Sequence, residues 1–148
     1  MVQGQAPVRG AHAALEAVAF GSVAVTTRAI AAAGLDLTFA QWRVLVVVGE
    51  SPNGATVTEV AARLGAEISP VSRLVSRLAR RGVVKARKDD QDRRVTRVTV
   101  TAEGRELRET VIARRRELLA DVLAAAGPIS PEAEAALERI GAALRRYT

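Results

Sequence analysis

The sequence contains no cysteine and only one histidine, His12, and aromatic residues make up 3% of its 148 residues. Without cysteine the chain forms no disulfide, no thiolate metal site and no thiol redox sensor. H-E-x-x-H, G-x-S-x-G and glycine-rich phosphate loops are also missing. We therefore expect no enzyme, no metal and no cofactor. For His12 we expect an exposed or packing position, with a place in an effector pocket as the alternative.

Long uninterrupted apolar runs are scarce as well, so we expect no membrane span and no membrane partner. The first residues, MVQGQAPVRG, lack a continuous apolar core before a cleavage site. This predicts a frayed N-terminus and a cytoplasmic protein. With 148 residues, 49% of them hydrophobic, the chain is long enough for a single domain with its own core.

Positive charge is abundant and local. The formal net charge is +6, yet residues 63–97 alone hold eleven Lys or Arg against four Asp or Glu. The rest of the chain is therefore slightly acidic. A concentrated basic segment is typical of a surface that binds a polyanion, which is either nucleic acid or an acidic membrane.

Helix-forming residues dominate, and breakers and capping residues divide the chain. Thr38 with Gln41, and Thr56 with Glu59, have the spacing of capping boxes, and Gly65 ends the second of these helices. Ser69 followed by Pro70 predicts the N-cap and first position of the next helix, and Ser130 followed by Pro131 repeats the pattern. The predicted helices cover about residues 11–33, 38–49, 56–65, 69–82, 101–126 and 130–147.

Between the fourth and fifth helices the pattern changes to β-branched alternation. VVKARK and VTRVTV, separated by the polar residues 89–94, predict a two-stranded hairpin. Two short helices joined at a glycine and followed by such a hairpin are typical of a winged helix. We therefore predict a mainly α fold with a small β-hairpin, a winged helix-turn-helix of six helices.

The helix at residues 69–80 separates into two faces when it is wound at about 100° per residue. The apolar face holds Val71, Leu74, Val75 and Leu78. The opposite face holds Ser69, Ser72, Arg73, Ser76, Arg77 and Arg80. Hydroxyls and guanidiniums contact phosphates and base edges, so we predict a DNA recognition helix, in which Pro70 lies against a thymine methyl. The alternative is that this polar face is an ordinary solvated surface. The basic hairpin that follows the helix argues against that alternative.

The hairpin loop places three carboxylates among cations. Arg93 and Arg94 are suited to the minor groove, whose negative potential attracts guanidinium. We interpret Asp92 as the carboxylate that orders the loop or a neighbouring guanidinium, and Asp89 and Asp90 as turn formers that bond their own backbone. We assign Arg80, Lys85, Arg87 and Arg97 to phosphates or to wing structure.

With these motifs the sequence resembles the multiple-antibiotic-resistance repressor (MarR) family. The resemblance runs through LTFAQWRVL, VTEVAARLG, SPVSRLVSRLARRGVVKAR and DDQDRRVTRVTVTAEG. Its most specific part is the spacing D-x-R-x-x-R at Asp92, Arg94 and Arg97. The resemblance implies a homodimeric regulator, pairing of Asp92 with nearby arginines and insertion of Arg94 into the minor groove. It also implies an unidentified phenolic or anionic effector, for which no residue here gives evidence.

The terminal helices support dimerisation independently. Apolar residues recur at helical spacing over 107–122 and 133–147, more than one small domain needs. We predict a winged-helix lobe at about 38–101 and dimerisation helices at about 11–33 and 102–147. The alternative is that both ends fold back on their own domain. For Trp42 we expect a core position rather than a ligand-stacking one.

The preferred function is a sequence-specific regulator of transcription, a repressor that binds duplex DNA. The rival is a basic helical module that binds RNA or an acidic membrane. Readers of single-stranded RNA display stacking aromatics, and residues 63–97 contain none.

Overall fold

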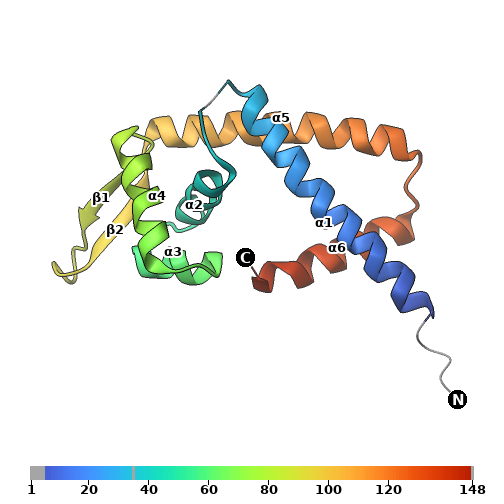
Figure 1. Ribbon diagram of the computed structural model, residues 1–148, viewed down its shortest axis with the longest axis horizontal. Helices are drawn as coiled ribbons and strands as arrows, with labels where there is room; N and C mark the ends of the chain where they lie inside the picture. The colour runs from blue at the N-terminus through green and yellow to red at the C-terminus, as the bar shows by residue number, and fades with distance from the viewer. Residues whose placement is uncertain (1–5, 35, 148) are drawn as a thin grey trace, which may run out of the picture.

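The computed structural model describes residues 6–34 and 36–147. Within them the chain forms six α-helices, a two-stranded antiparallel sheet and a short 3₁₀ helix (Figure 1). This confirms the predicted fold class. The elements are α1 (Ala6–Ala32), α2 (Phe39–Gly49), α3 (Val57–Leu64), α4 (Ile68–Arg80), β1 (Val84–Lys88), β2 (Thr96–Val100), α5 (Ala102–Ala126), α6 (Pro131–Leu144) and η1 (Arg145–Tyr147).

A small apolar core joins α2, α3, α4 and the base of the hairpin. Leu45, Val60, Leu78 and Val98, one from each of these elements, are almost fully buried. Trp42 is buried in the same core, as predicted. Both capping boxes are formed, with Thr38 accepting from the Gln41 backbone and Thr56 from that of Glu59. These caps fix where α2 and α3 begin.

The turn between α3 and α4 is short and begins at Gly65. Gly65 has φ +60° and ψ +38°, the left-handed conformation that glycine commonly adopts at the C-terminal end of a helix. The predicted Ser69 cap is wrong: α4 begins at Ile68, two residues before the predicted first position Pro70, and its N-cap Glu67 makes no side-chain capping bond. Pro70 is therefore the third helical residue. It is tolerated there because the first-turn amides have no acceptor inside the helix.

The hairpin is fastened to the lobe at two points. A bridge pairs Ala55, before α3, with Val98 of β2, with N–O distances of 3.0 and 2.8 Å. At the start of α5, Gly104 lies against the Val83 carbonyl, where an added Cβ would come within 2.0 Å of the oxygen. The base of the wing is thus held by backbone contacts on both strands.

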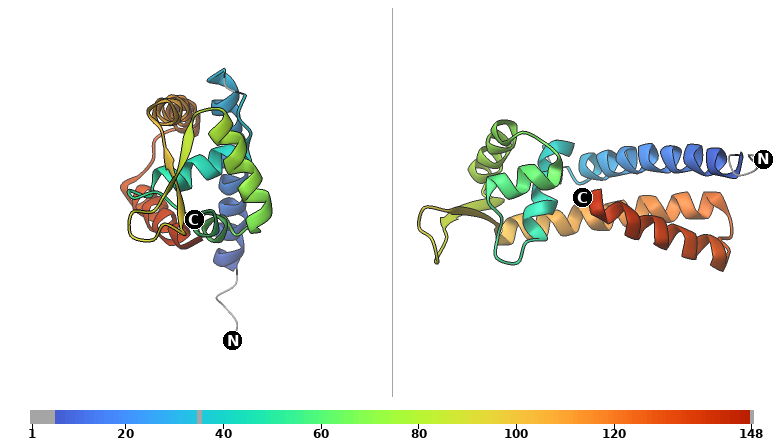
Figure 2. Two further views of the ribbon diagram at one scale, coloured as in Figure 1. Left: turned by 90° about the vertical axis from the view of Figure 1, so that its left-hand side faces the viewer. Right: turned by 90° about the horizontal axis from the view of Figure 1, so that it is seen from below.

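The terminal helices extend away from the lobe. Figure 2 shows α1, α5 and α6 on one side of the molecule and the hairpin at the opposite end. Helix α1 packs on α5, whereas α6, which continues directly into η1, packs little on the other helices of the described residues. Helix α1 begins at Ala6, five residues before the predicted start, and the predicted frayed N-terminus lies partly outside the described residues.

Much apolar surface on these helices is uncovered in the single chain. The exposed large side chains include Phe20 of α1, which is 82% exposed, and Leu137 of α6, which is 49% exposed. Between α1 and α6 lies an apolar groove of about 450 Å³ lined by Leu15, Val18 and Ile140 among others. One chain therefore leaves its terminal helices only partly covered.

Helix α1 also corrects one expectation. Gly10–Ala32 is long and apolar enough to cross a membrane by length and composition, although no such run was predicted. The reason is its many alanines, which raise the mean hydropathy without forming a bulky apolar stretch. Exposed His12 and Glu16 lie on the same helix, with His12 Nδ1 4.0 Å from the Glu16 carboxylate.

Candidate nucleic-acid interface

The outer face of α4 carries the predicted recognition residues, and all of them are exposed: Ser69, Pro70, Ser72, Arg73, Ser76, Arg77 and Arg80. The inner face holds Val71, Val75 and Leu78, which are buried. Ser76 Oγ donates to the Ser72 carbonyl at 2.9 Å, so this hydroxyl is bound to its own helix in the free protein. The structure therefore brings the predicted contact residues together on one exposed surface.

Asp89 is the central carboxylate of the wing. Its Oδ1 accepts hydrogen bonds from the backbone N–H groups of Gln91 at 2.8 Å and Asp92 at 3.2 Å. Its Oδ2 accepts a hydrogen bond from Arg97 Nε, so one side chain orders both the loop and a guanidinium. The turn-forming role predicted for Asp89 is present. The pairing with Arg97, however, belongs to Asp89 and not to Asp92.

Arg97 connects the wing to the helix-turn-helix through Gly54 and Glu59. Its NH1 lies 3.4 Å from Glu59 Oε2 and 3.4 Å from the Gly54 carbonyl oxygen. The same Glu59 oxygen accepts the Thr56 backbone N–H at 2.8 Å, which is one half of the α3 capping box. The carboxylate that caps α3 therefore also holds the wing arginine.

The strand register explains why so many carboxylates are needed. In the sheet Arg87 faces Arg97, and like charges directly opposite each other destabilise a strand pair. Arg97 pairs with Asp89, and Arg87 NH2 pairs with Asp90 Oδ2 at 3.1 Å. Asp90 is thus an ion-pair partner, where the sequence suggested a turn former. Each arginine of the opposed pair has its own counter-charge.

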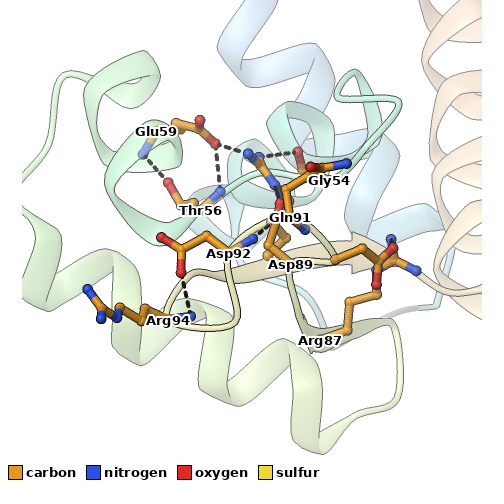
Figure 3. Close-up of polar contacts among 10 residues, drawn as sticks. Gly54, Thr56, Glu59, Arg87, Asp89, Gln91, Asp92 and Arg94 are labelled. Carbon is orange, nitrogen blue, oxygen red and sulfur yellow. Dashed lines mark hydrogen bonds and ion pairs between the residues drawn. The ribbon is translucent and has the colours of Figure 1, made fainter.

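Asp92 orders the tip of the loop through the backbone. Its Oδ1 accepts the Arg94 N–H at 2.9 Å, and its carbonyl accepts the Val95 N–H at 2.9 Å. Figure 3 shows the Asp92 carboxylate on the Arg94 backbone, with the Arg94 guanidinium pointing away. Asp92 therefore holds the loop that carries Arg93 and Arg94, and it makes no ion pair with a guanidinium in the described residues.

The basic residues divide into two groups. Arg87 and Arg97 are paired with carboxylates, as described above. Several exposed arginines within residues 6–34 and 36–147 have no hydrogen-bond or ion-pair partner. At the candidate interface these are Arg73, Arg77 and Arg80 of α4 and Arg93 and Arg94 of the wing. The second group is available to an external anion without the loss of an internal contact.

The ionisation of the wing carboxylates follows from these contacts. The hydrogen bond from Arg97, followed by those from the Gln91 and Asp92 backbones, lowers the pKa of Asp89 to about 2. The pKa of Glu59 is lowered as well, chiefly by the hydrogen bond from the Thr56 backbone and further by the charge of Arg97. The pKa of Arg97 is raised, mainly by its hydrogen bond to Asp89. The contacts that brace the wing are therefore fully charged at neutral pH.

A polar cleft lies between the wing and α3. Its lining includes Glu50, Arg63, Arg87 and Asp90. Arg63 NH2 lies 2.6 Å from Glu50 Oε2, and Arg87 is paired with Asp90. The charged groups of the cleft thus satisfy one another, and no group of three or more potential metal ligands occurs among the described residues.

Comparisons with known proteins agree with this geometry. The sequence profile of the MarR family matches residues 35–95, which contain the helix-turn-helix and most of the wing. A MarR-family transcriptional regulator from Rhodococcus sp. RHA1 has a similar structure, with a TM-score of 0.73, 25% identity and coverage of 98% of this chain and 99% of that one. Residues 35–95 of this chain, which include its helix-turn-helix, are thus similar to the MarR family.

Two further structures extend the comparison. CouR from Rhodococcus jostii RHA1, bound to p-coumaroyl-CoA, is 26% identical, with a TM-score of 0.74 over 96% of this chain and 94% of that chain. A MarR family protein from Bacillus stearothermophilus, 23% identical, matches with a TM-score of 0.80 over 98% and 97% of the two chains and shows the shared fold. No curated protein sequence matches significantly. The chain thus has the fold of a MarR-family transcription regulator along nearly its whole length.

Two functional contacts were missed from the sequence. Glu59 was recognised only as a capping residue, and Asp89 only as a turn former. The available signal was the hairpin register: pairing residues 84–88 with 96–100 sets Arg87 against Arg97 and requires nearby carboxylates. The contact to Glu59 depends on how α3 packs against the wing, for which the MarR sequence pattern gives no local signal.

We predict that the brace between Asp89 and Arg97 persists at neutral pH and is lost only in strong acid. Because the pKa of Asp89 is depressed to about 2, its stabilising contribution is complete above about pH 4, the ordinary range of an aspartate. That contribution disappears as the pH falls towards 2. Carboxyl NMR titration should give an Asp89 midpoint near 2 in the wild type.

The matched variant is Arg97→Gln, which removes the charge that Asp89 faces. Its Asp89 midpoint should rise part of the way towards the ordinary value, because the two backbone hydrogen bonds remain. An unchanged midpoint would show that Arg97 does not stabilise the carboxylate in solution.

Proposed function

We propose that the protein is a homodimeric, sequence-specific DNA-binding repressor. The observation that carries the proposal is the exposed face of α4, with its hydroxyls and unpaired guanidiniums, beside a braced wing that presents Arg93 and Arg94. In this arrangement α4 enters the major groove and the wing reaches the neighbouring minor groove. We assign Arg80, Lys85 and Arg87 to phosphate contacts on the flanks of this surface.

The terminal helices support the homodimer. Phe20, Leu137 and other large apolar side chains of α1, α5 and α6 remain exposed in one chain, and the groove between α1 and α6 is apolar. A second copy covers this surface and sets two recognition helices about one DNA turn apart. We assign residues 38–101 to the DNA-binding lobe and residues 11–33 and 102–147 to dimerisation.

The proposal includes a small phenolic or anionic effector that releases the DNA, and a cytoplasmic location. The effector is supported by the similar CouR structure, which holds p-coumaroyl-CoA. We assign no residue of this chain to its binding, and we propose neither catalysis nor a membrane partner.

Selection of bound sequences from random duplex DNA is the direct test. A homodimer should enrich a site with two-fold symmetry whose half-sites lie about one helical turn apart, roughly 10 base pairs. Binding to vesicles of acidic lipid, run in parallel, tests the membrane alternative raised by α1. Enrichment of no sequence, together with capture by the vesicles, would overturn the proposal.

Arg94→Ala should weaken binding to the selected site by about 1–3 kcal/mol, and it should reduce any preference for A/T-rich flanks. The expected cause is loss of an insertion into the minor groove, since this guanidinium has no internal partner to release. Titration of labelled duplex at fixed salt measures the loss. Arg116→Ala on α5 removes the same charge far from the wing and serves as the control. Equal losses in the two variants would show a charge effect only.

Two variants of Asp92 distinguish its ordering of the loop from the effect of its negative charge on DNA binding. Asp92→Ala removes the acceptor of the Arg94 N–H and should weaken binding, because the loop loses its preferred conformation. Asp92→Asn keeps an oxygen acceptor and removes the negative charge, so it should bind DNA as tightly as the wild type or more tightly. If both variants tighten binding, Asp92 acts only through its charge.

A further inference from the structure

One large apolar side chain is exposed far from the terminal helices. Ile68, the first residue of α4, is 52% exposed. The other exposed large apolar residues of the described chain lie on α1, α5, α6 and η1 or in the α5–α6 turn. Those surfaces are accounted for by a second copy of the chain, whereas Ile68 is not.

Ile68 lies where the apolar and polar faces of α4 meet. It is one helical turn before the buried Val71 on one side and the exposed Ser72 on the other. Arg73 and Arg77 lie about 140° and 180° away from it around the helix. An exposed isoleucine in this position leaves apolar surface in contact with water. It does not cap the helix either, since the N-cap residue is Glu67.

The major groove offers one kind of apolar group. Of the four bases only thymine presents a methyl group there, and the other edges present hydrogen-bond donors and acceptors. A branched apolar side chain at the leading end of a recognition helix matches that methyl in size and polarity. The guanidiniums elsewhere on α4 are suited to phosphates, whereas the apolar side chain of Ile68 contributes nothing to a phosphate contact.

We infer that Ile68 is a specificity-determining residue that packs against the C5-methyl group of a thymine in each half-site. The inference rests on the proposed DNA binding and adds a base preference to it. Pro70, in the same first turn, is the competing apolar contact. The two residues point in different directions around the helix, two positions and about 200° apart.

Replacement of thymine by uracil in the DNA tests the contact, because it deletes the methyl group and leaves the hydrogen-bonding edge unchanged. The probe is the duplex selected from random DNA, synthesised with uracil at each thymine in turn, symmetrically in both half-sites. For the wild type, one such position should lower the affinity about fourfold per methyl group, or roughly 15-fold for the pair. No loss at any position would overturn the inference while leaving DNA binding itself intact.

The protein variants complete a double-mutant cycle. Ile68→Ala should bind the thymine and uracil duplexes equally. Ile68→Val should retain most of the discrimination, and Ile68→Thr, which has nearly the shape of valine but carries a hydroxyl, should lose most of it. Circular dichroism and thermal melting of each variant check that α4 is retained.

Pro70→Ala is the matched comparison. It should keep the wild-type difference between thymine and uracil. If Pro70→Ala abolishes the difference and Ile68→Ala does not, the methyl contact belongs to Pro70 and the inference is wrong. Failure of the wild type to select any DNA sequence would instead contradict the proposed function, so the two failures are distinguishable.

Discussion

The ion pair between Arg97 and Asp89 is the contact on which the wing depends. Arg97 lies in β2, Asp89 at the start of the loop, and Glu59 in α3, so one guanidinium joins three elements that are distant in sequence. A two-stranded hairpin alone is only marginally stable in water. Here the bridge between Ala55 and Val98 holds the base of the hairpin, and a charged hydrogen bond from Arg97 to Glu59 joins the wing to α3, which is itself anchored in the core.

This bracing explains the mixture of charges in the wing. A loop made only of cations would repel itself and would lose conformational entropy when it inserted into a groove. The three carboxylates of the loop all bind groups within the wing. Asp89 pairs with Arg97 and Asp90 with Arg87, and Asp89 and Asp92 also accept hydrogen bonds from backbone amides. Arg93 and Arg94 are thereby held on an ordered loop while their guanidiniums remain available. In this short segment the arginines are available for binding, and the aspartates order the loop that carries them.

Local sequence signals were sufficient for most of the fold. The capping boxes at Thr38 and Thr56, the glycine after α3 and the alternation of the strands each depend on residues a few positions apart. The errors arose where the outcome depends on something more distant. Helix α4 begins after Glu67, which makes no side-chain capping bond, so no local capping signal marks its start. The partner of Arg97 is decided by strand register and by α3 packing, and neither can be read from the spacing D-x-R-x-x-R.

The wing is joined directly to the terminal helices where β2 runs into α5. Strand β2 ends at Val100 and α5 begins at Ala102, with Thr101 donating to the Gly82 carbonyl at 2.7 Å and capping α5 through Gly104 N–H. Gly104 lies so close to Val83 that this junction cannot open without separating the strand from the helix. The wing and α5 therefore move together. Helix α5 also contributes the buried side chains Leu107 and Val111 to the core, so a change in its angle would act on the wing and on the core together. If a second copy covers the exposed apolar surface of α1, α5 and α6, as proposed, the packing of that interface acts on the direction of each wing through α5.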